Sequence, residues 1–184
     1  MIASITTIYL HFTRTMANSN RSVDPPDQPK GKTKFFSPIY WLAVGLGSGL
    51  VPKAPGTFGT LVAIPLYLLL NSLWIWYYLA VVVVGFLIGI WICATAARQL
   101  GVHDDPSIVW DEIIGFLITM IAAPPGWLWI GIGFVLFRIF DIIKPWPIRR
   151  IDQQVGGGLG IMLDDVLAGI YALIVLQVLA KVIG

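Results

Sequence analysis

Charged side chains are scarce in this sequence. Only 12% of its 184 residues are Asp, Glu, Lys or Arg, and the mean hydropathy is +0.82. A typical soluble domain carries about 25% charged residues, so the composition favours one polytopic membrane domain. The formal net charge of +2 is small, and no basic patch with interleaved aromatic residues is present. Nucleic-acid binding is therefore excluded.

Cysteine and histidine are also rare. The one cysteine, Cys93, lies inside an apolar run, which leaves no disulfide framework and no cysteine-based zinc site. Of the two histidines, His11 lies near the start of the chain and His103 has no second histidine or cysteine at ligand spacing. Any metal bound by this chain is therefore expected to have oxygen ligands.

Several motifs of phosphate chemistry are missing. Cys93 and Arg98 are one residue too close together for a cysteine-phosphatase loop. There is no Asp-x-Asp-x-Thr/Val nucleophile, no Gly-x-x-x-x-Gly-Lys-Ser/Thr loop and no alcohol-phosphotransferase signature. The glycine run at 156–160 opens an apolar segment without a preceding strand, so a hinge is favoured over a phosphate contact.

The first 37 residues differ in composition from the remainder. Residues 17–34 are polar and rich in proline, and cannot bury enough apolar surface to offset the entropy of ordering. Residues 1–37 are therefore predicted to be a disordered extension. They show no signal peptide pattern, and Met16 is an alternative start. Residues 38–184 are predicted to form a single membrane domain.

Five apolar runs predict an all-α membrane protein with about five transmembrane helices. The runs are residues 58–70, 73–97, 108–123, 127–140 and 159–180. Uncharged turns at 71–72 and 124–126 separate two helical hairpins. Residues 38–57 are apolar but interrupted by glycine and proline, which predicts a short interfacial or re-entrant segment.

Lysine and arginine predict the orientation of these helices. Most basic residues fall on the side opposite the two uncharged turns, and the positive-inside rule assigns that side to the cytoplasm. These residues are Lys30, Lys32, Lys34, Lys53, Arg98, Lys144, Arg149 and Arg150. Lys181 alone lies outside, so the N-terminus is predicted to be cytoplasmic and the C-terminus external.

Acidic residues meet on the same side. Asp111-Glu112 and Asp164-Asp165 are adjacent acidic pairs at the cytoplasmic starts of two helices. Arg138 and Asp141 end another helix at the same face, and Lys144 lies in the loop after it. Carboxylates inside apolar runs are costly unless something cationic balances them. Carboxylate ligands point to Mg²⁺, and neighbouring basic residues point to a phosphate. At a membrane surface, the phosphate is expected to belong to a lipid headgroup.

Simpler explanations exist for parts of this cluster. Arg138 and Asp141 have the spacing of a plain helical ion pair, Lys53 can serve only to set topology, and Asp152 is predicted to be a solvated loop residue. A carrier or channel would also place ionisable groups among helices. Such a protein would need them distributed towards the bilayer midplane, whereas here they gather on one side.

Four motifs in order resemble the phosphatidylglycerophosphatase A family. They are Gly-Ser-Gly-Leu-Val-Pro-Lys-Ala-Pro-Gly-Thr-Phe-Gly-Thr (47–60), Ile-Val-Trp-Asp-Glu-Ile-Ile-Gly (108–115), Phe-Arg-Ile-Phe-Asp-Ile-Ile-Lys-Pro-Trp-Pro-Ile (137–148) and Gly-Ile-Met-Leu-Asp-Asp-Val-Leu-Ala-Gly (160–169). The resemblance covers residues 38–180. It implies a Mg²⁺-dependent phosphatase of the bacterial inner membrane. Such an enzyme hydrolyses phosphatidylglycerophosphate to phosphatidylglycerol and inorganic phosphate at the cytoplasmic leaflet.

The resemblance also suggests roles for individual residues. The predicted metal ligands are Asp111, Glu112, Asp164 and Asp165. The predicted catalytic residues are Asp141, Asp104, Arg138 and Lys144, and the predicted substrate-binding residues are Lys53, Gly56, Thr57 and Arg149. Either water or one of the aspartates would attack the phosphorus. The alternatives are another lipid-phosphate phosphatase or phosphotransferase, and a small membrane transporter.

Overall fold

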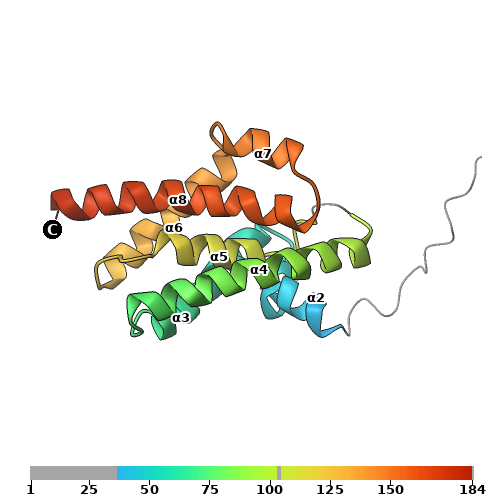
Figure 1. The fold of residues 1–184 in the computed structure, drawn as a ribbon, viewed down its shortest axis with the longest axis horizontal. Helices are drawn as coiled ribbons and strands as arrows, with labels where there is room; N and C mark the ends of the chain where they lie inside the picture. Colours follow the sequence, from blue (N-terminus) through green and yellow to red (C-terminus); the bar gives the residue numbers. More distant parts are fainter. Residues whose placement is uncertain (1–36, 103–104, 184) are drawn as a thin grey trace, which may run out of the picture. The chain divides into compact units, whose positions relative to one another are not determined.

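The computed structural model describes residues 37–102 and 105–183, and all regular structure in these ranges is helical (Figure 1). The prediction of an all-α fold is confirmed for this part of the chain. The predicted disorder of residues 1–37 and the predicted catalytic residue Asp104 fall outside it, apart from Ser37. The helices are α2 (Pro38–Ala43), the 3-10 helix η2 (Gly45–Leu50), α3 (Pro55–Leu70), α4 (Ile75–Leu100), α5 (Trp110–Thr119), α6 (Trp127–Ile143), α7 (Ile148–Gln154) and α8 (Gly157–Ile183).

Helices α4 and α8 are the longest. They contain 26 and 27 residues, and among the described helices these two are long and apolar enough to cross a membrane by length and composition. At 1.5 Å per residue each extends about 40 Å. The hydrocarbon core of a bilayer is about 30 Å thick, so either helix would span it with residues to spare.

Helix α5 forms the centre of the helical bundle. It packs against α8, α3 and α4, and its residues from Ile113 to Thr119 are all buried. Close approach to α8 depends on two glycines, because a Cβ atom on Gly169 would lie only 2.5 Å from the carbonyl oxygen of Gly115. The first turn of α5 carries Asp111 and Glu112, and this packing brings them next to the acidic pair of α8.

The connections between helices divide between the two ends of the bundle. The α3–α4 turn, the α5–α6 turn and the C-terminal end of α8 lie at one end, on the left of Figure 1. The starts of α3, α5 and α8 lie at the other end, together with α2 and α7 (Figure 1). The two turns, residues 71–74 and 120–126, include the predicted turns at 71–72 and 124–126 but are longer.

The observed helices differ from the predicted ones most clearly at α3, α5 and α7. Helix α3 begins at Pro55 rather than at residue 58, because proline fits the first turn of a helix, where its missing N–H needs no partner. Helix α5 covers 110–119 rather than 108–123. Residues 148–154, predicted as loop, form α7, whose Ile148 is completely buried. Seven residues rarely form a helix alone, and this tertiary contact supplies the missing stability.

Candidate active site

A cavity of about 330 Å³ opens where the starts of α3, α5 and α8 meet the end of α6. Its ionisable lining consists of five carboxyl groups and two cationic side chains: Asp111, Glu112, Asp141, Asp164, Asp165, Arg138 and Lys144. The remaining lining residues are Ala54, Pro55, Gly56, Pro106, Ile108 and Ile142. Carboxyl groups therefore outnumber cations, and a bound positive charge would balance the excess.

Three of these acids converge on one point. Asp111 and Glu112 come from α5 and Asp165 from α8, and each offers an oxygen atom so that all three oxygens lie within 4.8 Å of one another. The Asp165 residue is only 3% exposed. Glu112 Oε2 and Asp165 Oδ2 are buried and have no hydrogen-bond partner in the described part of the chain. Buried carboxylate oxygens without donors are costly, whereas a hard divalent cation would satisfy them.

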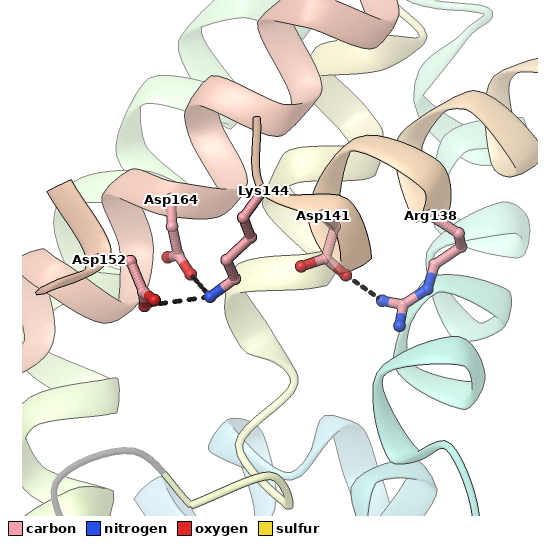
Figure 2. A network of polar contacts seen from close by, with 5 residues as sticks. All are labelled: Arg138, Asp141, Lys144, Asp152 and Asp164. Atoms are coloured by element: carbon pink, nitrogen blue, oxygen red, sulfur yellow. Dashed lines mark hydrogen bonds and ion pairs between the residues drawn. The ribbon is translucent and has the colours of Figure 1, made fainter. Parts of the chain in front are cut away.

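Asp164 has a different partner from Asp165. Its Oδ2 accepts a hydrogen bond of 2.6 Å from Lys144 Nζ, and the same ammonium donates to Asp152 Oδ1 at 3.0 Å (Figure 2). Burial lowers the pKa of Lys144, but the hydrogen bonds to Asp164 and Asp152 outweigh burial and raise the pKa above its ordinary value. Lys144 therefore carries its charge at neutral pH. Asp152, predicted as a solvated loop residue, is instead part of this network.

Arg138 and Asp141 form an ion pair on the last turns of α6. The distance from Arg138 Nη1 to Asp141 Oδ2 is 2.5 Å, and both side chains are largely buried at the cavity wall (Figure 2). The spacing of three residues brings the two side chains together on one face of the helix. Arg138 Nε is buried and has no hydrogen-bond partner within the described ranges, so the guanidinium retains donor capacity beyond its pairing with Asp141.

The start of α3 closes one side of the cavity. Ala54 has a left-handed backbone with φ of +52°, and Pro55 begins the helix. Gly56 is buried against two site residues, because a Cβ atom there would collide with Glu112 Oε1 and lie 2.9 Å from Arg138 Nη1. Position 56 thus has room for a backbone but not for a side chain.

Three other predicted residues lie away from the cavity wall as the structure describes it. Lys53 and Arg149 are exposed, and Thr57 is partly buried and donates its backbone N–H to Ala54 O at 3.0 Å. Among the acidic residues that the structure describes, Asp152 was dismissed by the sequence analysis but contacts the candidate site through Lys144. Its spacing of four residues from the apolar Ile148 is the signal that could have placed both on one face of a short helix.

Comparison with known proteins gives consistent matches. Residues 41–180 match the family model described as phosphatidylglycerophosphatase A. A protein of that name from Escherichia coli K12 is 50% identical over 145 residues, which cover 78% of this chain and 84% of the relative. A protein of the same name from Haemophilus influenzae is 47% identical over 151 residues, which cover 81% of this chain and 93% of the relative.

A third relative carries a different name. A Bacteroides thetaiotaomicron protein with the provisional name phosphatidylinositol-3-phosphatase is 42% identical over 162 residues, which cover 83% of this chain and 99% of the relative. No solved structure matches the chain.

Proposed function

Because the chain belongs to the phosphatidylglycerophosphatase A family, we propose that it hydrolyses phosphatidylglycerophosphate to phosphatidylglycerol and inorganic phosphate. The family relation makes it a phosphatase, and a lipid phosphate is its substrate class. The observation that carries the proposal is the cavity in which three converging carboxyl groups lie beside Arg138 and Lys144. Acidic metal ligands next to cationic side chains can together bind a phosphate monoester and stabilise the charge of its transition state.

Asp111, Glu112 and Asp165 are the proposed ligands of Mg²⁺. The fit is supported by the buried, donor-free oxygens of Glu112 and Asp165, and by an all-oxygen ligand set, which Mg²⁺ prefers. When bound, the ion supplies positive charge to the phosphoryl oxygens and favours ionisation of water at neutral pH. Asp164, the fourth predicted ligand, is proposed to act mainly by holding Lys144.

The cationic residues are proposed to bind the phosphoryl group. Arg138 and Lys144 lie on the cavity wall and can donate hydrogen bonds to its equatorial oxygens, where negative charge spreads in the transition state. Asp141 is proposed to orient Arg138 through their ion pair. Gly56 allows the start of α3 to approach the same point, and Lys53, Thr57 and Arg149 are proposed to contact the glycerol headgroup further out.

The proposed setting is the bacterial inner membrane, with residues 38–184 as one multi-pass domain and the cavity facing the cytoplasm. Helices α3, α4, α5, α6 and α8 are its five proposed membrane segments, and α2 with η2 forms the interfacial segment. Support comes from the exposed Trp74, Trp76 and Trp127 at the end opposite the cavity. Tryptophan at this level is typical of a membrane–water interface.

The decisive experiment measures phosphate release by the detergent-purified full chain. Phosphatidylglycerophosphate, phosphatidic acid and phosphatidylinositol 3-phosphate are compared, each with Mg²⁺ and then with EDTA. The expected result is release that requires Mg²⁺ and strongly prefers phosphatidylglycerophosphate. A preference for phosphatidylinositol 3-phosphate would instead favour the activity for which the Bacteroides relative is named. Folded protein that releases no phosphate from any of the three lipids would refute the proposal.

A further inference from the structure

The ammonium group of Lys144 is held by two carboxylates from two different helices. Lys144 is the residue directly after α6, has a left-handed backbone with φ of +44°, and lines the cavity. Asp164 on α8 accepts its hydrogen bond at 2.6 Å and Asp152 on α7 at 3.0 Å (Figure 2). An ammonium has three N–H donors, so this arrangement leaves one for a ligand in the cavity.

Helix α7 presents Asp152 to this network for a structural reason. Ile148 and Asp152 are one turn apart and share one face of the helix. Ile148 is completely buried, and α7 packs against α8. The buried face of α7 therefore fixes the direction of Asp152, while Arg149 and Gln153 remain exposed.

We propose that Asp152 is a positioning residue, which acts through Lys144 by holding its ammonium where the third N–H donor can bind a substrate phosphoryl oxygen. The inference rests on the proposed phosphatase function. With Asp164 alone, the flexible lysine side chain would keep one anchor and could rotate about it. Asp152 adds the second anchor. Residues that orient metal ligands by hydrogen bonding are typically worth about tenfold to a hundredfold in activity, and an effect of that order is expected for Asp152.

Stabilisation of the fold is the competing explanation for this contact. The Asp152 side chain is 33% exposed and that of Lys144 is 25% exposed. Ion pairs that solvent reaches contribute little to folding. The main effect of Asp152 is therefore expected in substrate binding rather than in stability.

A double-mutant cycle on the full-length enzyme tests this inference. Asp152→Ala is expected to lower kcat/KM by about tenfold to a hundredfold with a raised KM, and Asp152→Glu is expected to recover part of the loss. In a Lys144→Met background, Asp152→Ala should not lower kcat/KM further, because the ammonium group that Asp152 holds is absent. Gln153→Ala, an exposed neighbour on α7, is the matched control and should behave as wild type.

Two kinetic outcomes would overturn the inference. One is an unchanged KM and kcat/KM in Asp152→Ala. The other is an equal loss with and without Lys144, which would mean that Asp152 acts independently. A purely structural role would lower kcat in the Lys144→Met background as well, because fewer enzyme molecules would be folded and active.

A second measurement does not depend on activity. Carbodiimide treatment of the folded protein joins amines to carboxylates in contact, and peptide mapping by mass spectrometry identifies the pairs. Each Lys144 amine forms one amide, so some molecules are expected to carry a Lys144–Asp152 link and others a Lys144–Asp164 link. Links to Asp164 alone would refute the positioning contact. If wild type hydrolysed no lipid phosphate but both couplings formed, the proposed function would fail while the Asp152–Lys144 contact stood.

Discussion

Asp165 is the residue whose surroundings most strongly demand a cation. It is almost completely buried, and its carboxyl group lies close to those of Asp111, Asp141 and Asp164. Like charges gathered in a poorly solvated place repel one another. A bound cation, which the chain itself does not supply, therefore best explains why four acidic side chains lie so close together.

Replacing Asp165 with asparagine tests that explanation. The amide has nearly the same shape but no charge, so Asp165→Asn should lower phosphate release by about 100-fold or more if this carboxylate holds the metal. Membrane insertion should be unchanged, and the thermal unfolding midpoint measured without Mg²⁺ should stay the same or rise, because one repelling charge is gone. Full activity in the variant would remove this acid from the mechanism.

Gly56 offers a second test at the same scale. A methyl group at this position would collide with Glu112 and crowd Arg138, so Gly56→Ala should reduce kcat/KM by about tenfold or more, the typical cost of disturbing groups around a metal site. The matched control is Gly131→Ala on α6, where an added Cβ meets nothing within 4 Å. Equal activities for the two variants would show that the start of α3 lies farther from the reacting groups than the structure indicates.

The gathering of these residues around one cavity was largely predictable from the sequence, but their pairings were not. Residue type and a predicted shared membrane side were enough to group the two acidic pairs with Arg138 and Lys144. The sequence could not show that adjacent Asp164 and Asp165 take different partners, because successive residues on a helix point about 100° apart and their neighbours depend on packing. Nor could it show that Asp152 reaches Lys144, which depends on the formation of α7.

At the scale of helices, long apolar runs were predicted well and short segments poorly. The runs that became α4, α6 and α8 were identified within a few residues, since hydropathy over about twenty residues is a strong signal. Helix α7 was missed because its seven residues, Ile148–Gln154, carry little helical signal of their own. Its stability comes from Ile148, whose burial depends on the position of α8.

Helix α8 is also tied to the α5–α6 turn, far from the cavity. Gln177 Nε2 donates to Ile121 O at 2.9 Å and to Ala122 O at 3.0 Å. Ala122 has a left-handed backbone with φ of +52°, so the side-chain donor supports a turn that few non-glycine residues adopt. This contact contributes to the stability of the fold without touching the site.

Gln177→Ala should therefore separate stability from catalysis. The loss of two hydrogen bonds is expected to lower the free energy of unfolding by about 1–2 kcal/mol, measured as a thermal midpoint a few degrees below wild type in detergent. The kcat of the folded enzyme should not change. Lys181→Ala, an exposed position on the same helix, is the control. A fall in kcat with an unchanged midpoint would contradict this division.

At the scale of the whole molecule, polarity differs between the two ends of the bundle. The described basic residues other than Lys181 lie at or near the cavity end, whereas the opposite turns are uncharged and carry exposed Trp74 and Trp127. Membrane insertion retains basic segments in the cytoplasm. A phosphatase with this orientation would meet its lipid substrate in the cytoplasmic leaflet, on the side where the predicted active site lies.

Cysteine labelling in intact cells tests this orientation. Single cysteines are placed at Ser72 and Lys181 for the uncharged end and at Gln153 for the cavity end, all exposed positions. The buried native Cys93 should leave wild type unlabelled as the control. With a membrane-impermeant maleimide applied to spheroplasts, Ser72→Cys and Lys181→Cys should react directly, and Gln153→Cys only after permeabilisation. The opposite pattern would place the cavity at the outer leaflet. Labelling of Ser72→Cys and Gln153→Cys from the same side would mean that an even number of the helices α4, α5 and α6 crosses the membrane, and would refute the proposed five-segment topology.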